Sequence, residues 1–310
     1  MQDCIVLPGK TGILKQRTKA HLALLFTNLF FAINFTAVKQ LINQGLVKPF
    51  GLNLLRVGIS AILLWTLFLF SSKKLRLQRR HLGRFILCAL TGIAINQLLF
   101  IKGLSLTYPI HASLLMLTTP ILITVIAAWL LKEPVNGYKI SGLLLGIAGA
   151  TVLVTSRDST GAASEVLFGD ILILLNAISY TFYFILVRPL MKAYDPILVI
   201  RIVFTIGFFM ILPFCWQEFR EIPWDSYSIE AYGLLALIVI GGTFLAYLFN
   251  VYGIKMLGAS IAGAYIYAQP VFAAIIAILF LGEQISMYKL IAALLIFSGV
   301  YLANKTNSNA

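Results

Sequence analysis

Amide and phenol side chains recur at helical spacing inside the long apolar segments of this 310-residue chain. Asn176, Tyr180 and Tyr183 are separated by four and three residues, so they share one stripe of a helix. Amides in hydrocarbon need hydrogen-bond partners, and we therefore expect them to face a bundle interior or an aqueous cavity. A neutral cavity of this kind is expected to suit a small amphipathic solute. The alternative is that these groups only hold neighbouring helices together.

Two further segments carry similar pairs. Tyr247 and Asn250 are three residues apart, and Tyr265 and Gln269 are four apart, directly before Pro270. We interpret the polar residues of both halves as cavity-lining candidates: Asn34, Asn96, Gln97, Asn176, Tyr180, Tyr183, Tyr247, Asn250, Tyr265 and Gln269. For any single member, packing between helices remains the alternative.

Two prolines interrupt apolar segments near their middle. Pro120 and Pro270 cannot donate to the carbonyls of Met116 and Ile266, which bends or breaks a helix at those points. They are hinge candidates for gating, or static kinks of the kind common in membrane helices.

Four charged residues lie at or inside apolar segments. Glu133 and Glu283 occupy helix junctions, where we expect each carboxylate to accept hydrogen bonds at the start of the next helix. Arg56 and Arg201 lie several residues inside their segments. Arginine within a membrane is usually functional, but both are near enough to an edge to snorkel. We assign Glu133, Glu283 and Arg56 structural roles.

Residues for catalysis or metal binding are not grouped. The three cysteines and three histidines are scattered singly, without the spacing of a zinc site or a redox pair. There is no P-loop and no pair of catalytic groups within the spans, so we expect neither an enzyme nor a cofactor. No Asp or Glu falls in the middle of a span, and the usual carboxylate of a proton-driven carrier is missing.

The amino-acid composition indicates an integral membrane protein. Apolar residues make up 60% of the chain and charged residues 11%, against about half and about a quarter in soluble domains. Because a soluble domain of this length buries only about three quarters of its surface, lipid must cover the remainder. We predict ten transmembrane helices near residues 21–42, 50–70, 83–104, 110–131, 138–155, 169–190, 197–216, 231–254, 260–281 and 287–304. The runs are continuous rather than alternating, so the fold is all-α.

The net charge of +13 is distributed unevenly. Six basic residues crowd the short loop after the second segment: Lys73, Lys74, Arg76, Arg79, Arg80 and Arg84. With an inner N-terminus, 16 basic residues lie inside and 6 outside, as the positive-inside rule requires. Both termini are therefore expected in the cytoplasm, with residues 1–20 as a cytoplasmic segment. The same distribution argues against nucleic acid as a partner.

An internal repeat relates the two halves. A shift of 150 residues overlays 98–153 on 248–303 without a gap, with 13 identities in 56 positions that include Pro120 with Pro270 and Glu133 with Glu283. The repeats span 21–155 and 169–304. Because each contains five predicted helices, the two must be inverted relative to one another, as in many secondary transporters.

These positions also resemble a known family. The segment from Phe31 to Lys39, with Phe31 and Ala32 in place of a usual Trp and Gly, is similar to the first-helix pattern of the EamA-like family of ten-helix carriers in the drug/metabolite transporter superfamily. Further matches are Arg56, Pro120 with Lys132–Glu133, Gly169–Asp170, Val187–Leu190, and Gln269–Pro270 with Leu281–Glu283. The resemblance covers roughly residues 20–304.

The resemblance implies a carrier in a bacterial inner membrane that exports amino acids or related metabolites by alternating access. Its partners are then a small-molecule solute and the lipid bilayer. An alternative is efflux of aromatic or cationic drugs, for which tyrosine rings supply cation–π contacts. An intramembrane enzyme is a remote third class, since it needs catalytic pairs that the spans do not contain.

Overall fold

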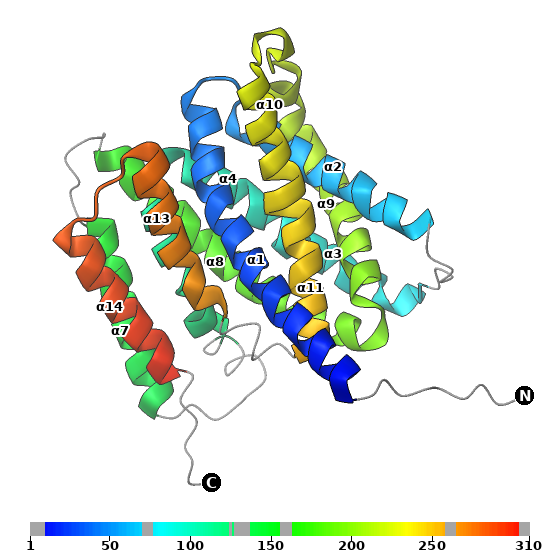
Figure 1. The fold of residues 1–310 in the computed structure, drawn as a ribbon, viewed down its shortest axis with the longest axis horizontal. Coiled ribbons are helices and arrows are strands. Elements are labelled where there is room, and N and C mark those ends of the chain that lie inside the picture. The colour runs from blue at the N-terminus through cyan, green and yellow to red at the C-terminus, as the bar shows by residue number, and fades with distance from the viewer. Residues whose placement is uncertain are drawn as a thin grey trace, which may run out of the picture.

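The computed structural model describes residues 10–69, 77–123, 126, 137–155, 163–257 and 265–303. Within these ranges the chain forms helices joined by turns, and no strand occurs, as the all-α prediction requires. The helices form a bundle in which α1 begins and α14 ends at the same side, the lower one in Figure 1. We call this side the terminal end.

The helices have the following bounds. In chain order they are α1 (Lys10–Asn43), α2 (Pro49–Leu69), η1 (Arg79–His81), α3 (Leu82–Ala89), η2 (Leu90–Ala94), α4 (Ile95–Leu106), α5 (Pro109–Met116), α7 (Gly137–Thr155), α8 (Ala163–Ala193), α9 (Pro196–Arg220), η3 (Trp224–Ser226), α10 (Ile229–Ala236), η4 (Leu237–Leu245), α11 (Ala246–Leu257), η5 (Ile266–Ala268), α13 (Gln269–Leu281) and α14 (Met287–Ala303).

Six helical runs of the described chain are long and apolar enough to cross a membrane. They are Gln16–Asn43, Pro49–Leu67, Arg79–Leu106, Glu165–Ala193, Pro196–Arg220 and Ile229–Leu257. Four shorter apolar helices accompany them: Pro109–Ile123, Ile140–Leu153, Ile266–Leu281 and Met287–Leu302. The protein is thus a multi-pass membrane protein, and the count of ten spans stays a prediction.

Helix boundaries follow from local chemistry. Proline at the first helical position opens α2, α5 and α9, where its missing N–H has no partner to lose. The Asp195 carboxylate caps α9 by accepting from the Ile197 N–H at 3.0 Å. Helix α13 ends at Leu281 and is followed by Gly282, whose φ of +65° is a left-handed conformation that favours glycine.

Equivalent helices of the two repeats pack against each other in antiparallel directions. Gly51, at the start of α2, lies against the Glu218 backbone near the end of α9, and Gly58 lies against the Phe208 ring. Helices α7 and α14 are also antiparallel, since Gly149 lies against Ile296 and Gly299 lies against the Gly142 backbone. Antiparallel pairing of equivalent helices is the packing that an inverted repeat predicts.

Two π-helical segments occupy equivalent positions of the repeats. Shifting η2 by 150 residues places it at 240–244, inside η4. Gly92 of η2 approaches the Tyr183 ring, and its counterpart Gly242 approaches the Asn34 side chain. A Cβ at Gly242 would lie 2.5 Å from Asn34 Oδ1, so only glycine permits this contact.

Each candidate hinge proline lies directly after a break in its helix. Helix α5 ends at Met116, a turn covers residues 117–118, and helical structure resumes one residue before Pro120. Pro270 is the second residue of α13, which follows the 3₁₀ turn η5. The chain is therefore interrupted at both positions, because proline lacks the N–H that a continuous helix needs.

Candidate functional site

A cavity of about 140 Å³ lies between helices of both repeats. Eight of the ten predicted residues line it: Asn34, Asn96, Gln97, Asn176, Tyr180, Tyr247, Asn250 and Gln269. The wall also contains Arg56 and Thr119, together with Phe100 and Met116. The structure thus brings together most of the polar stripes that the sequence singled out, and their amides and hydroxyls surround one space.

The remaining two predicted residues lie elsewhere. The Tyr183 ring packs on Gly92, whose hypothetical Cβ would lie 2.4 Å from Tyr183 Cδ2. The Tyr265 hydroxyl lies 2.8 Å from His21 Nδ1, near the terminal end of α1. Helical spacing groups residues on one face of a helix, but it does not define how far along the bundle a cavity extends.

Four residues of α1 in the cavity wall were not among the predicted lining residues. Thr27, Asn28, Phe31 and Phe35 of α1 all line the cavity. Thr27 and Phe31 precede Asn34 by seven and three residues, and therefore lie on the same stripe. That spacing was a usable signal, although apolar rings within an apolar segment do not stand out.

Asn96 and Asn176 hold α4 and α8 together across the repeat boundary. Asn176 Nδ2 donates to the Asn96 carbonyl at 2.7 Å, and Asn96 Nδ2 donates to the Asn176 carbonyl at 3.3 Å. A carbonyl only accepts, so the orientation of the Asn176 amide is fixed and its Oδ1 remains an acceptor. These residues both join the helices and line the cavity, so the two interpretations of amides within spans apply together.

Arg56 does not snorkel to the membrane surface. Its exposed fraction is 3%, its Nε donates to Thr243 Oγ1 at 3.1 Å, and its guanidinium carbon lies 5.8 Å from the centre of the Phe100 ring. Arg56 lines the cavity, so the structural role assigned from the sequence omitted its place in the wall.

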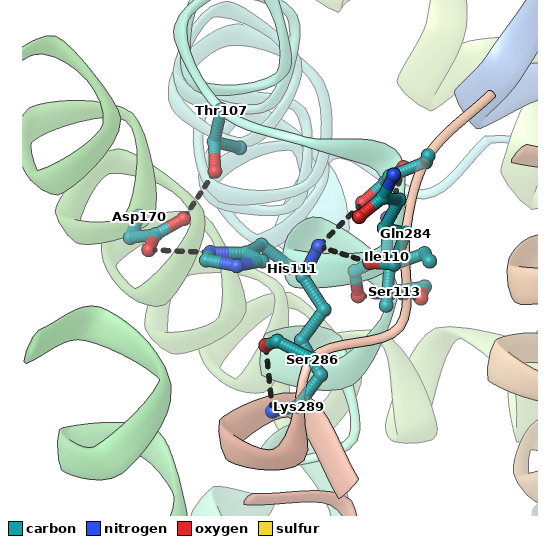
Figure 2. A network of polar contacts seen from close by, with 9 residues as sticks. Thr107, Ile110, His111, Ser113, Asp170, Gln284, Ser286 and Lys289 are labelled. Carbon is teal, nitrogen blue, oxygen red and sulfur yellow. Dashed lines mark hydrogen bonds and ion pairs between the residues drawn. The ribbon is translucent and has the colours of Figure 1, made fainter. Parts of the chain in front are cut away.

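A second polar cluster lies away from the cavity, between α4, α5 and α8 (Figure 2). His111 Nδ1 lies 3.1 Å from Asp170 Oδ2, and the Thr107 hydroxyl donates to Asp170 Oδ1. The side chains of His111 and Asp170 are fully buried. Helical spacing does not reveal this contact, because the crossing of α5 and α8 joins residues 59 apart in sequence.

The geometry of this cluster favours structure over catalysis. The Asp170 carboxylate accepts from Thr107 and lies against His111, so the hydroxyl is not activated by the imidazole. None of these three residues lines the cavity. Asp170 lies inside α8, which begins at Ala163 rather than at the predicted residue 169.

Glu283 contacts the start of a helix, but not the predicted one. Its Oε2 accepts from the Ile110 N–H at 3.4 Å, at the start of α5, and its Oε1 lies 3.4 Å from Lys289 Nζ in α14. Ser286 accepts from the Lys289 N–H instead, as Figure 2 shows. Burial raises the pKa of the Glu283 carboxyl above its usual value, and Lys289 opposes this shift. Glu133 lies outside the described residues.

The described residues contain no group of three or more His, Cys, Asp or Glu side chains that could hold a metal ion. Cys88 and Cys215 are buried free thiols on different helices. The polar atoms of the cavity wall therefore come from amides, hydroxyls and one guanidinium.

Comparisons with known proteins agree with this architecture. The model of the EamA-like transporter family matches residues 18–155 and 167–305. The chain is 24% identical to an uncharacterized transporter of Archaeoglobus fulgidus, with 92% of this chain and 97% of that protein covered. It is 28% identical to the uncharacterized transporter YoaV of Bacillus subtilis, with 94% and 98% covered. The WAT1-related protein At3g53210 of Arabidopsis thaliana is 26% identical, with 93% and 85% covered.

A solved crystal structure has the same fold. It superposes with a TM-score of 0.60 at 20% identity, covering 94% of this chain and 96% of the other. Family matches to both halves, transporters among the relatives and helices of membrane-spanning length together define a membrane transporter of small solutes. The chain belongs to the EamA-like transporter family.

Proposed function

We propose that this protein exports amino acids or related small amphipathic metabolites by alternating access. The observation that carries the proposal is a cavity whose wall comes from both repeats and combines amides, hydroxyls and aromatic rings. Its volume of about 140 Å³ is close to the ~150 Å³ of a cavity that accepts benzene. A small amino acid is of this size.

The two-repeat architecture supports alternating access in this proposal. Inverted repeats allow one half to rock against the other about a central site, which exposes the site to each side in turn. The breaks before Pro120 and Pro270 supply equivalent points at which the wall of each half can bend. Both prolines are hinges in this proposal, because Met116, Thr119, Ile266 and Gln269 of the wall flank them.

Export is supported by the position of the cavity along α1. The lining residues of α1 run from Thr27 to Phe35, and they lie closer to the terminal end than Val38 and Leu41 do. Val38 and Leu41, in its second half, are fully buried in an apolar cluster with Ile101 and Leu104. With cytoplasmic termini, as the charge distribution predicts, the cavity is loaded from the cytoplasm and closed toward the outside.

The second class of cargo, cationic drugs, is less well supported. Arg56 is a buried cation in the cavity wall, and none of the described lining residues carries a carboxylate to attract a cation. Two like charges at close range in a medium of low dielectric repel each other strongly. Aromatic rings alone do not offset that repulsion.

Liposomes test the proposed function directly. The purified protein is reconstituted, the vesicles are loaded with a mixture of the proteinogenic L-amino acids and quaternary ammonium dyes, and release is followed by mass spectrometry. We expect release of one or more amino acids above that from protein-free vesicles. Release of the dyes alone would assign the protein to drug efflux, and release of nothing would contradict transport of either class.

A further inference from the structure

We propose that Arg56 binds the carboxylate of the transported solute, while the amide oxygens of Asn34, Gln97 and Asn176 bind its ammonium group. The substrate class is then zwitterionic α-amino acids. This inference rests on the proposed transport function and specifies which chemical groups the cavity recognises.

The first observation is the lack of a counter-charge for Arg56. The guanidinium is permanently charged, and Arg56 is buried with an exposed fraction of 3%. Its Nη1 has no hydrogen-bond partner within the described part of the chain, and no described residue of the cavity wall is acidic. A buried charge is stabilised only when it is paired and hydrogen-bonded. An anion in the cavity would supply the counter-charge and the hydrogen-bond acceptor that Arg56 lacks.

The second observation is that the Arg56 guanidinium is held in place through its Nε atom. Its Nε donates to Thr243 Oγ1, and the Thr243 hydroxyl in turn donates to the Ile238 carbonyl at 3.0 Å. Thr243 and Ile238 are five residues apart within the π-helical segment η4. This anchor fixes the guanidinium by its Nε and leaves the fork of terminal nitrogens to bind a carboxylate in the bidentate manner typical of arginine.

The third observation is a set of acceptors without donors. Asn34 Oδ1, Gln97 Oε1 and Asn176 Oδ1 are buried and have no hydrogen-bond partner among the described residues. All three side chains line the same cavity as Arg56. An ammonium group has three donors and no acceptor, and therefore matches a wall whose unpaired atoms are mostly oxygens.

Only a zwitterion supplies both requirements. An amine without a carboxylate adds a positive charge beside Arg56, and a carboxylate without an amine leaves the three oxygens without donors. An amino acid pairs both kinds of group and carries no net charge into the membrane. Discrimination is expected to be strong, because a buried polar group left unpaired disfavours the wrong ligand.

The experiment compares matched probes in liposomes that contain the full-length protein. Alanine, valine, leucine and phenylalanine are each tested beside the corresponding amide, amino alcohol and deaminated carboxylic acid. We expect the amino acids to cross at least about tenfold faster than their amides and alcohols, since each loses a charge-assisted hydrogen bond. Equal rates for an amino acid and its amide would overturn the inference.

Variants then assign the carboxylate contact to Arg56. Arg56→Gln is expected to lose amino acid flux by about tenfold or more, and Arg56→Lys to keep part of it, because charge remains while the fork is lost. Arg201→Gln is the matched control, since Arg201 is 4% exposed but does not line the cavity. Flux is normalised to inserted protein. Wild-type flux in Arg56→Gln would contradict the assignment.

The outcomes separate this inference from the proposed function. Release of quaternary ammonium dyes or uncharged solutes without release of any amino acid would preserve transport and overturn the role of Arg56. If Arg56→Gln does not insert, Arg56→Lys and the probe series on the wild-type protein decide the question. No flux of any probe in the wild-type protein would count against transport itself.

Discussion

Gln97 and Tyr247 occupy equivalent positions of the two repeats, 150 residues apart, and hydrogen-bond one another, with Gln97 Nε2 3.2 Å from the Tyr247 hydroxyl. A contact between equivalent residues lies on the local twofold axis that relates the halves. Both residues line the cavity, so the axis of the inverted repeat passes through the candidate site.

The same axis relates other contacts. Asn176 Nδ2 donates to the carbonyl of Asn96, whose counterpart is Ala246, and the Ala246 carbonyl accepts from Thr27 Oγ1 at 3.3 Å. The helix pairs α4 with α8 and α1 with α11 are thus each joined by a side chain that donates to a backbone carbonyl. Symmetry is retained in the backbone contacts, while the side chains that make them have diverged.

Gln269→Leu tests the cavity assignment in the second repeat. Gln269 lines the cavity, and leucine removes its donor and acceptor while keeping its approximate size. We expect loss of solute flux or a changed solute preference at normal insertion, measured as flux per inserted protein. A residue that only packs would lose one interhelical hydrogen bond, about 0.6 kcal/mol, and transport would continue.

Two controls accompany this variant. Gln97→Leu is the first-repeat comparison and is also expected to reduce flux, since Gln97 lines the same cavity. Gln217→Leu changes an exposed glutamine near the end of α9 and is expected to leave flux unchanged. Wild-type flux and selectivity in Gln269→Leu would remove the second repeat from the site.

Single cysteines at equivalent positions test the inverted topology. Gly137 and Met287 begin α7 and α14, are 150 residues apart, and are both exposed. We expect a membrane-impermeant maleimide added to intact cells to label Met287→Cys and not Gly137→Cys, in a background without native cysteines. Permeabilised cells, in which both are labelled, serve as the control. Labelling of both positions in intact cells would contradict the inverted arrangement.

Transport is expected to proceed without an imposed pH gradient. None of the described residues that line the cavity is a carboxylic acid, so the wall offers no ordinary proton carrier. Counterflow in liposomes, with equal pH on both sides and a protonophore present, is predicted to match counterflow without the protonophore. Flux that requires a proton gradient and collapses with the protonophore would disprove this energetic scheme.

Glu283 and Lys289 are expected to respond differently to neutralisation. Lys289→Met leaves the buried Glu283 carboxylate without its cation and is predicted to destabilise the protein by about 3 kcal/mol or more. Glu283→Gln keeps an acceptor for the Ile110 N–H and is expected to be much milder. Thermal unfolding in detergent micelles measures both variants.

The pH dependence of that comparison has a definite sign. The folded state binds the Glu283 proton more tightly than the unfolded state, since burial raises the pKa of this carboxyl. Wild-type stability is therefore lost as pH rises through the raised pKa, whereas Glu283→Gln has no such group. The melting temperature of the variant minus that of the wild type is expected to increase as the pH rises above the usual pKa of a glutamate and through the raised pKa of Glu283. A constant difference would contradict the raised pKa.

Much of the fold was predictable because membrane spans depend on composition and length. Helical periodicity defines a face, and eight of the ten residues selected in this way line one cavity. It did not exclude Tyr265, which lies on the predicted stripe but bonds His21 of α1. Position along the bundle depends on tilt and on which helices cross, and a single sequence does not contain that information.

The polar pairs between helices escaped prediction for a related reason. His111 and Asp170 belong to different repeats, and neither has a partner at helical spacing. Arg56 was interpreted from its distance to the end of its span, and that distance is compatible both with a role inside the membrane and with snorkelling to the surface. Its contact with Thr243 joins α2 to η4 and becomes apparent only after the second repeat has folded against the first.

The glycine contact between α7 and α14 has a consequence for the order of synthesis. Helix α7 packs almost entirely against α14, and a Cβ at Gly299 would lie 2.7 Å from the Gly142 carbonyl oxygen. The ribosome completes α7 near the middle of the chain, but α14 is the last helix of the described part to emerge. During translation the glycine-containing face of α7 therefore lies in the bilayer without α14 as its packing partner. This pair cannot assemble until Met287–Ala303 has been synthesised, so a chain truncated before Met287 leaves the α14-facing side of α7 exposed to lipid.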